Sequence, residues 1–367
     1  MLLAYVAGGH LHVVDAGASR QLAQLGTVSQ PSWSASGRWL AYVSEGGLWM
    51  ARADGSQAQR IGTAAAASWS PVTPDRLAVA SDRGLLVTAP NAAPLTLAGG
   101  CSVGSFAWSA DGTSLAAACG NPGGVDRLVT FSAAGGTPAT VDVPAALAGG
   151  DAALQLAGWW PGGLLVWIDP HHSASIAADG MSLLSISATG AQPPRTLATT
   201  LGYTSWLAWS PDHRHLLIVE GGDRMAWTGK RLAVCDVAAG TCSPLPSGTN
   251  TVDLDPAWSP DGRRIAFVRA SALSDTGGET PQWTASRTLW TAAADGSNAA
   301  PVSSAPTGIS APHWSGDSTQ LAVVAGDRVV LVEPGSGAVT IVASGIDATS
   351  LDYYGSADWS AVLAWAP

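Results

Sequence analysis

Residues 256–269 read Pro-Ala-Trp-Ser-Pro-Asp-Gly-Arg-Arg-Ile-Ala-Phe-Val-Arg, and they predict an antiparallel hairpin. Ala257 and Trp258 end one strand, residues 259–262 reverse the chain, and residues 265–268 return as a short apolar strand. In the turn, the proline presets φ, the aspartate can accept hydrogen bonds from the backbone ahead of it, and the glycine accepts a positive φ. The apolar run after the turn is typical of a fully buried strand.

The same hairpin recurs along the chain. In most copies the apolar strand begins seven residues after a tryptophan, and these motif tryptophans are Trp33, Trp69, Trp108, Trp159, Trp209, Trp258 and Trp314. Successive motif tryptophans are 36, 39, 51, 50, 49 and 56 residues apart. A repeat of this length, made of short strands and Gly/Asp turns, predicts a β-propeller in which each repeat forms one four-stranded blade.

The two ends of the chain complete one further repeat. Residues 363–367 match 207–211, which end an innermost strand, and residues 2–6 match 39–43. We therefore expect 361–367 to pair with 2–6 in one sheet and close the ring without an open edge. Counting Trp365, eight motif tryptophans predict an all-β, eight-bladed propeller that spans residues 1–367 as one domain. Seven blades is the alternative, if one weak repeat is not a true blade.

The Trp-Ser-Pro-Asp-Gly hairpins, together with Ala-Asp-Gly-Ser turns at 53–56 and 294–297, resemble the repeats of TolB-like propellers. The resemblance covers nearly the whole chain, and it implies the propeller architecture and an interaction or ligand-binding role. It does not extend to the separate N-terminal domain that accompanies the TolB propeller, because the repeats already begin at residue 2.

Composition restricts the classes of partner. The formal charge is −10, the only lysine is Lys230, and 47% of the residues are apolar while 12% are charged. A nucleic-acid-binding protein needs a basic face, so we expect no nucleic-acid partner. No run of 18 apolar residues occurs, so we expect no membrane span in this chain. A closed propeller of this kind is expected to be monomeric and to need no cofactor.

The four cysteines form two pairs, and each pair straddles a predicted hairpin. Cys101 and Cys119 flank one turn, and Cys235 and Cys242 flank another. Facing residues of an antiparallel pair are close enough for a disulfide, so we predict bridges Cys101–Cys119 and Cys235–Cys242. Four buried free cysteines are the alternative. Disulfides predict an extracytoplasmic protein: periplasmic, secreted, or anchored at the surface through an upstream segment, which the start in mid-blade also indicates.

Two sets of repeated residues are explained by structure. The motif tryptophans are expected to pack between adjacent blades. Asp111, Asp212, Asp261 and Asp317 fall in the turns between the two inner strands, where they are expected to stabilise the turn.

The residues that the repeat does not require point to a binding face. If the strands of a blade are A to D from the inside out, the B–C and D–A connections emerge on one face. Blades 5, 6 and 7 have long B–C loops at about 169–180, 220–230 and 269–287, and the D–A connection 345–359 is also long. Long loops in a compact domain are commonly functional.

Aromatic and charged side chains in these loops are expected to be exposed, and they predict a site for a protein, peptide or carbohydrate at the channel mouth. The candidate binding residues are Asp169, His171, His172, Arg224, Trp227, Lys230, Trp283, Arg287, Tyr353, Tyr354 and Trp359. We expect alanine at Trp227 and Trp283 to weaken binding and leave the fold intact. The alternative is that the loop aromatics only anchor their own loops.

An enzyme is the second hypothesis for the same mouth. Propellers also occur as metal-dependent lyases and cyclases that use channel-mouth histidines. Adjacent residues of extended backbone point to opposite sides, so His171 and His172 are poorly placed to bind one ion, and no third ligand accompanies Asp169. The sequence also lacks a Gly-x-Ser-x-Gly elbow. We therefore predict no metal site and favour a non-enzymatic binding module.

Overall fold

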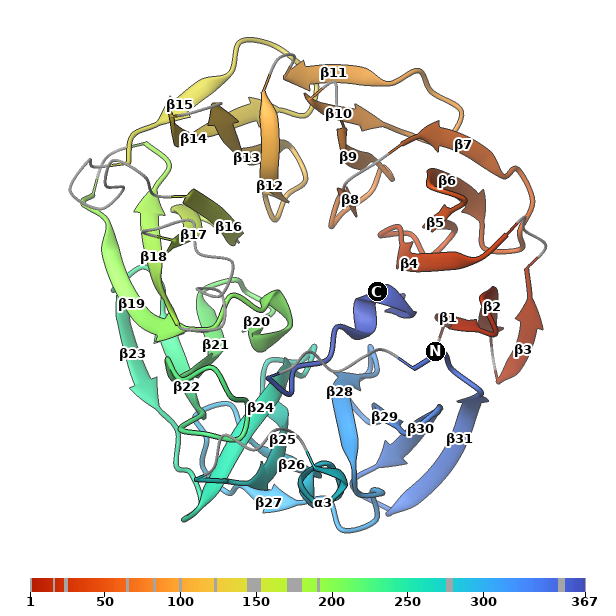
Figure 1. Cartoon of the computed structure of the whole chain (residues 1–367), viewed down its shortest axis with the longest axis vertical. Coiled ribbons are helices and arrows are strands. Elements are labelled where there is room, and N and C mark those ends of the chain that lie inside the picture. The colour runs from red at the N-terminus through yellow and green to blue at the C-terminus, as the bar shows by residue number, and fades with distance from the viewer. Residues whose placement is uncertain are drawn as a thin grey trace.

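A computed structural model describes residues 2–15, 17–22, 26–63, 66–81, 84–98, 101–121, 124–143, 153–169, 180–189, 192–274, 280–348 and 354–366. Eight four-stranded antiparallel sheets stand side by side around a common axis, as Figure 1 shows. The sheets follow one another in the order of the sequence, so each repeat is one blade. The predicted eight-bladed propeller is confirmed, and the seven-bladed alternative is wrong.

The strands of each blade run from the innermost, A, to the outermost, D. Blade 1 contains β32 (Leu363–Trp365), β1 (Leu2–Ala7), β2 (His10–Asp15) and β3 (Ala18–Gln21). Blade 2 contains β4 (Val28–Trp33), β5 (Trp39–Ser44), β6 (Gly47–Arg52) and β7 (Gln59–Gly62). Blade 3 contains β8 (Ala66–Trp69), β9 (Leu77–Ser81), β10 (Gly84–Thr88) and β11 (Leu95–Ala98). Blade 4 contains β12 (Ser102–Trp108), β13 (Ser114–Asn121), β14 (Gly124–Ser132) and β15 (Ala139–Val141).

Blade 5 contains β16 (Ala153–Trp160), β17 (Gly163–Asp169), β18 (Met181–Ser187) and β19 (Arg195–Thr200). Blade 6 contains β20 (Leu207–Trp209), β21 (His215–Glu220), β22 (Arg231–Asp236) and β23 (Thr241–Pro244). Blade 7 contains β24 (Thr251–Trp258), β25 (Arg264–Ser271), β26 (Thr288–Ala293) and β27 (Ala300–Pro301). Blade 8 contains β28 (Ile309–Trp314), β29 (Leu321–Ala325), β30 (Arg328–Glu333) and β31 (Ala338–Ser344). The helical segments within the described residues are η1 (Thr204–Trp206), α3 (Pro281–Ser286) and η2 (Trp359–Ala361).

The ring is closed in blade 1 by strands from both ends of the chain. β32 pairs antiparallel with β1, with Leu3 opposite Trp365 and Tyr5 opposite Leu363. The amide of Val6 also donates to the carbonyl of Val362 at 2.8 Å. The predicted pairing of the terminal segments is confirmed.

Three of the motif tryptophans, Trp33, Trp69 and Trp108, form hydrogen bonds between neighbouring blades. The indole nitrogen of Trp69 donates to the carbonyl of Ser32 in blade 2 at 3.2 Å, and that of Trp108 donates to Ser68 in blade 3 at 3.0 Å. Trp33 makes the same contact with Ala364 of β32 at 3.2 Å, so the terminal strand takes part in the repeat pattern. This confirms the structural role expected for these residues.

The aspartates of the A–B turns stabilise those turns. Ser259 Oγ donates to Asp261 Oδ1 at 2.6 Å, while the amide of Arg264 donates to Ser259 Oγ at 2.9 Å. The same serine–aspartate pair forms in blades 4, 6 and 8. In all four turns the hydrogen bond from the serine hydroxyl is the main cause that lowers the pKa of the aspartate, to about 2 for Asp317.

Both predicted disulfides are present. Cys235 lies directly opposite Cys242, with 3.9 Å between their Cα atoms. Cys101 and Cys119 are joined across 5.4 Å, although the residue directly opposite Cys119 is Val103. The pairing is therefore confirmed, and the first bridge is diagonal to the ladder.

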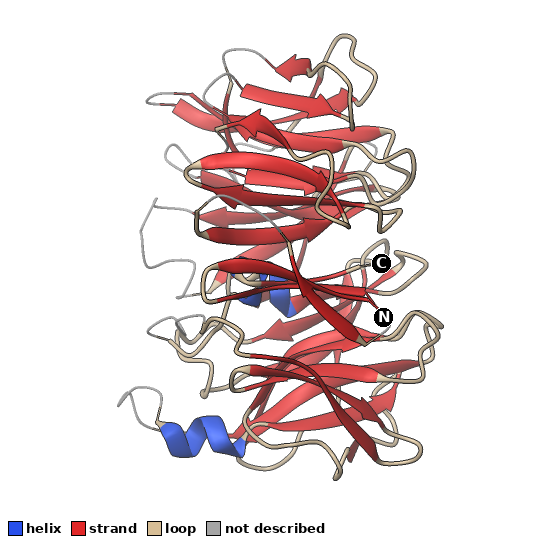
Figure 2. Cartoon of the chain, turned by 90° about the vertical axis from the view of Figure 1, so that its right-hand side faces the viewer, coloured by secondary structure: helices blue, strands red, loops and turns tan. Residues whose placement is uncertain are grey.

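The two faces of the disc differ in their connections. Blades 1, 2 and 8 join strands B and C by two-residue turns, as between Ser44 and Gly47, whereas blade 6 has ten residues between Glu220 and Arg231. In blade 7 this connection contains α3, which was not expected from the sequence. Thr280 caps α3 by accepting the amide of Trp283 at 3.1 Å, and Pro281 begins the helix. Seen from the side in Figure 2, α3 lies on one face and the termini lie toward the other.

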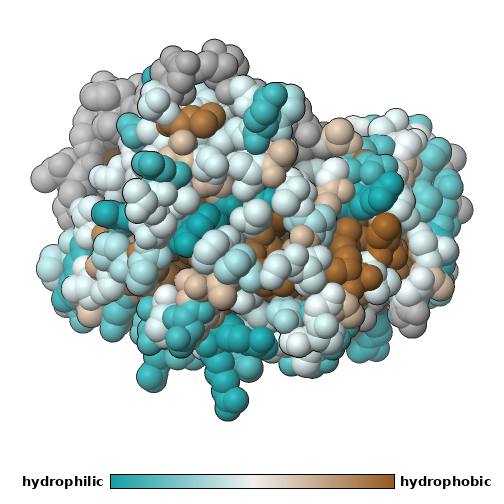
Figure 3. Space-filling model, turned by 90° about the horizontal axis from the view of Figure 1, so that it is seen from below, coloured by the Kyte–Doolittle hydropathy of each residue, from teal (hydrophilic) through white to brown (hydrophobic). Residues whose placement is uncertain are grey.

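The outer rim is chemically mixed. Figure 3 shows hydrophilic side chains interspersed with smaller apolar patches on one side of the rim. Val339 and Ile341 of β31 are 45% and 52% exposed, among the most exposed large apolar side chains of the described residues. None of the helices in the described part of the chain is long and apolar enough to span a membrane.

Candidate functional site

A cavity of about 740 Å³ opens at the centre of the face that carries the long loops. Its walls come from the D–A connection 202–205, the inner strands β24 and β28, and residues 356–365. We call it the mouth cavity. It lies at the channel mouth predicted from the sequence, but it is centred on blades 6, 7, 8 and 1 rather than on blades 5 to 7.

Repeated bulges shape the inner wall of the mouth cavity. In β24 the register with β25 shifts between Leu254 and Ala257, and Asp255 has a φ of +48° before Pro256. Ala311 in β28 has the same φ of +48° before Pro312. Because the proline has no amide hydrogen, no donor is left unpaired at its own position, and the bulge lets the residue before it leave the pleat. Asp255 and Ala311, the residues at these two bulges, both line the mouth cavity.

Residues 354–362 form a strap that reaches from blade 6 to the centre of the ring, as Figure 1 shows. At its outer end the carbonyl of Tyr354 accepts the amide of Ala226 at 2.8 Å. Gly355 lies so close to the Trp227 ring that a Cβ at this position would be 2.9 Å from it. At its inner end Asp358 caps η2 and accepts the amide of Ser360 at 3.0 Å. The strap therefore forms a fixed wall of the mouth cavity.

A stacked pair of rings separates the mouth cavity from a second cavity. His313 and Trp365 are parallel within 7°, with ring centroids 5.1 Å apart. Both residues also line a cavity of about 640 Å³ on the face of the A–B turns, which we call the opposite cavity. Burial lowers the pKa of His313 to about 4, so its imidazole is neutral at pH 7.

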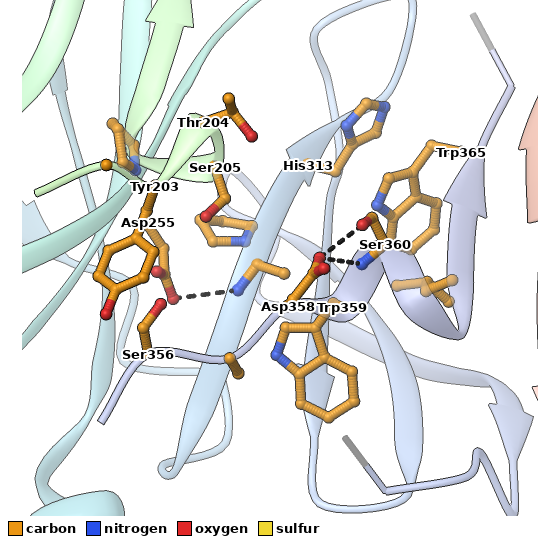
Figure 4. A pocket seen from close by; sticks show the side chains of 16 residues that line it. Tyr203, Thr204, Ser205, Asp255, His313, Ser356, Asp358, Trp359, Ser360 and Trp365 are labelled. Atoms are coloured by element: carbon orange, nitrogen blue, oxygen red, sulfur yellow. Dashed lines mark hydrogen bonds between the residues drawn. The ribbon is translucent and has the colours of Figure 1, made fainter. Parts of the chain in front are cut away.

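Figure 4 shows how the polar and aromatic side chains meet in the mouth cavity. Tyr203 and Asp255 lie on one side, while Asp358, Trp359 and Trp365 lie on the other. The described lining holds two carboxylates, several hydroxyls and one imidazole, and no lysine or arginine. Such a mixture of ring faces and a few polar groups is typical of small-ligand sites.

Several candidate binding residues lie beneath the cavity rather than in it. Arg287 Nη2 donates to Asp255 Oδ2 at 2.8 Å, and the Arg287 guanidinium lies 5.4 Å from the centroid of Trp283. Trp283 in turn meets Trp227 edge to face at 5.4 Å. These contacts form a continuous support from the cavity-lining Asp255 to the strap above Trp227.

The expectation that these loop residues are exposed is wrong. Trp227, Trp283, Lys230 and Arg287 are only 1%, 2%, 2% and 3% exposed. Burial also lowers the pKa of Lys230 to about 8, and its Nζ donates to the carbonyls of Asp223 and Thr228. The long loops fold inward because large rings and a few buried charges give them a small core of their own. Alanine at either tryptophan would leave a void, so we expect these substitutions to destabilise the fold rather than leave it unaffected.

The remaining candidates divide into four groups. Trp359 lines the mouth cavity as expected for a site residue. Arg224 and Tyr354 meet at the outer end of the strap, where the guanidinium lies 5.9 Å from the ring centroid. Asp169 ends β17 and is half-buried. His171, His172 and Tyr353 lie outside the residues that the structure describes.

The metal hypothesis finds no cluster in the described part of the chain. Within those residues, no three His, Cys, Asp or Glu side chains gather closely enough to hold an ion. The histidine that lines the mouth cavity, His313, contacts Trp365 rather than a carboxylate or a serine.

The sequence analysis overlooked Asp255, His313 and the 202–205 segment. One signal was available: Asp255 and Ala311 each precede a proline that stands two residues before a motif tryptophan, as Gln30 does in blade 2. A charged residue at this position in an apolar inner strand could have identified Asp255. No comparable signal marks residues 202–205, whose place depends on the path of the D–A connection.

No protein-family model and no curated protein sequence matches the chain. Among solved structures, a putative TolB from Agrobacterium tumefaciens aligns over 93% of this chain and 87% of its own length, with 16% identity and a TM-score of 0.40. TolB from Acinetobacter baumannii aligns over 100% of this chain and 66% of its own, with 12% identity and a TM-score of 0.44. Dipeptidyl peptidase 4 from Porphyromonas gingivalis aligns over 93% of this chain and 59% of its own, with 10% identity and a TM-score of 0.62.

These comparisons concern the fold alone. The chain spans 59% of the length of the peptidase, and an identity of 10% transfers no site residue between the two. TolB structures are among the similar ones, and membership of the TolB-like repeat family remains a prediction from the sequence motifs.

Proposed function

We propose that this propeller is a non-enzymatic binding module that acts outside the cytoplasm and holds its ligand in the mouth cavity. The observation that carries the proposal is the cavity itself. At about 740 Å³ it has the size of a small-ligand site, and it combines aromatic rings with hydroxyl and carboxyl groups. The proposed docking area thus moves from blades 5–7 to blades 6–8 and the strap.

The polar groups of the cavity have positioning roles that favour binding over catalysis. Asp358 caps η2, and Asp255 is held by Arg287 and by the amide of Ala311 at 3.3 Å. Burial keeps His313 neutral and stacking fixes its ring, so it is poorly suited to take up a proton near pH 7. A wall that is already rigid loses little conformational entropy when a ligand binds.

The two disulfides support an extracytoplasmic location, because cytoplasmic thiols are kept reduced. Protein isolated from its native cells with thiols blocked at lysis should show four cysteines protected from alkylation by mass spectrometry. Four alkylated cysteines would contradict the location.

The binding proposal can be tested by filling each cavity in turn. Ser205 is exposed and lines the mouth cavity, while Gln320 lines the opposite cavity, so Ser205→Trp and Gln320→Trp are matched blocking variants. A library of neutral, cationic and anionic fragments is screened by ligand-observed NMR. We expect the hits to be lost with Ser205→Trp and kept with Gln320→Trp. The reverse pattern, or no hit with the unmodified chain, would contradict the proposal.

A further inference from the structure

We propose that the mouth cavity selects an organic cation, with an ammonium or guanidinium group placed between Asp255 and Asp358. This inference rests on the proposed binding function and adds the chemical class of the ligand. It follows from the charges, the free acceptor atoms and the ring faces that line the cavity.

The charge of the lining favours a cation. Asp255 and Asp358 contribute two carboxylates, and no lysine or arginine lines the cavity among the described residues. Arg287 lies behind Asp255 and is only 3% exposed, so it offsets part of this charge without presenting its own to a ligand. A site lined by charge of one sign favours a ligand of the other and disfavours a phosphate or carboxylate.

Each carboxylate keeps one oxygen without a partner in the described chain. The Oδ2 atom of Asp255 accepts from Arg287 and from the Ala311 amide, and Oδ1 makes no such contact. In Asp358 the capping bonds from Ser360 all reach Oδ1, as the dashed lines in Figure 4 show, and Oδ2 is free. Hydrogen bonds from an ammonium or guanidinium to such oxygens are charge-assisted and stronger than neutral ones.

His313 adds a third acceptor at the bottom of the cavity. Its contact within the described chain is the stack on Trp365, and neither ring nitrogen has a hydrogen-bond partner there. Because burial keeps the ring neutral at pH 7, one of these nitrogens carries a free lone pair. A donor-rich head group can use this acceptor.

Aromatic rings complete the cationic site. Trp359 and Trp365 line one side of the cavity and Tyr203 lies across from them beside Asp255, as Figure 4 shows. Cations are attracted electrostatically to the faces of such rings.

The head group can reach the cavity from two sources. It can belong to a free small molecule, or it can be the end of an arginine or lysine side chain presented by a partner. The cavity volume accommodates both, so the shared chemistry is the proposal and the experiment separates the sources.

The test compares four probes with short alkyl chains by isothermal titration calorimetry on the full chain at pH 7: n-butylguanidinium, n-butylammonium, n-butylurea and butyrate. n-Butylurea has nearly the shape of n-butylguanidinium without its charge. We expect both cations to bind at least tenfold more tightly than n-butylurea, and butyrate to bind most weakly. Equal or tighter binding of n-butylurea or butyrate would overturn the proposal.

Two charge-matched variants locate the effect. Asp358→Asn removes one cavity carboxylate and keeps an oxygen that can cap η2. Asp212→Asn removes the same charge from an A–B turn of blade 6. We expect Asp358→Asn to weaken n-butylguanidinium binding at least fivefold and to leave n-butylurea unaffected, while Asp212→Asn changes neither by more than twofold. Unchanged cation binding in Asp358→Asn would overturn the proposal.

An arginine peptide separates the two sources. Acetyl-Gly-Arg-Gly-amide that binds more tightly than n-butylguanidinium indicates a side chain of a partner, and weaker binding indicates a free cation. Both outcomes support the cationic class.

Failure of this inference can be told apart from failure of the proposed function. If n-butylurea or butyrate binds best and Ser205→Trp abolishes that binding, the cavity is a binding site and only the charge preference is wrong. If Ser205→Trp changes the binding of none of the four probes, both the inference and the proposed function fail.

Discussion

Blades 2 and 7 share the four antiparallel strands of the repeat, which we call the frame. They differ in their loops and in the charged side chains that these loops and strands carry. Both have a bulge before a proline in the inner strand, with φ of +53° at Gln30 and +48° at Asp255. In blade 2 the B–C connection is a two-residue turn, the described charged residues are not buried, and Gln30 is exposed. In blade 7 the connection spans 272–287, and Asp255 is paired with a buried arginine. The repeat thus determines the backbone, while the inserted loop and its charges create the site.

The largest expected effect concerns the frame itself. If every blade depends on its inner strand, deleting residues 360–367 should leave β1 as a bare edge and remove the acceptor of the Trp33 indole. We expect a loss on the order of 5 kcal/mol or more in unfolding free energy, with aggregation. Thermal unfolding by circular dichroism measures it. A melting curve like that of the full chain would show that ring closure contributes little.

The next effect separates the long-loop region from the frame. Trp227 is 1% exposed and supports Trp283 and Gly355, so Trp227→Ala should cost about 4 kcal/mol. Trp49 of blade 2 is half-buried, and its indole donates to the carbonyl of Ser44 at 3.3 Å. Trp49→Ala should therefore cost clearly less in chemical denaturation. Equal losses of unfolding free energy would mean that Trp227 contributes no more to stability than Trp49, a residue of the repeated strands.

The sequence predicted the frame well because every blade repeats it. The eight blades, the ring closure and both disulfides depend on spacing and turn residues, which are local properties. The site was predicted less well because the burial of Trp227 and Trp283 depends on how two loops from different blades pack together. The cavity residue Asp255 depends on a bulge and on Arg287, 32 residues away, and neither is visible in a single repeat.

A third prediction concerns a charge pair that blade 7 has and blade 2 lacks. Arg269 donates to both oxygens of Asp253, at 2.6 and 2.8 Å, and Asp253 is 2% exposed. Asp253→Asn leaves the guanidinium buried without its counter-charge, so we expect a loss of about 3 kcal/mol. Glu220→Gln breaks the more exposed pair with Arg231 and should cost at most about 1 kcal/mol. Urea unfolding measures the loss of unfolding free energy in both variants. Equal losses would argue against a special contribution of the Arg269–Asp253 pair to stability.

The smallest effect concerns the A–B turns. In blade 8, Ser315 Oγ donates to Asp317 Oδ1 at 2.6 Å, and this bond is the first cause that lowers the pKa of Asp317 to about 2. Blade 2 has no aspartate in this turn, and Ser36 donates instead to Asp75 of blade 3. Ser315→Ala should raise the pKa of Asp317 toward its ordinary value of about 3.9.

The sign of the pH effect follows from that direction. A carboxylate with a lowered pKa in the folded state stabilises the fold above about pH 4, and this contribution is lost as the pH falls toward 2. Ser315→Ala should therefore weaken the dependence of stability on pH in this range. Carboxyl NMR titration measures the shift, and an unchanged pKa in the variant would assign the effect to the amide of Thr319 instead.

The central claim is that a ligand occupies the mouth cavity and not the opposite one. Trp359 lines the former and Trp258 the latter, so the two indoles report on the two faces. The most direct measurement is ¹⁹F NMR of protein labelled with 5-fluorotryptophan, titrated with n-butylguanidinium and assigned by Trp→Phe variants. The account predicts that the Trp359 signal shifts to saturation while the Trp258 signal stays in place. A shift of Trp258 without one of Trp359 would contradict it.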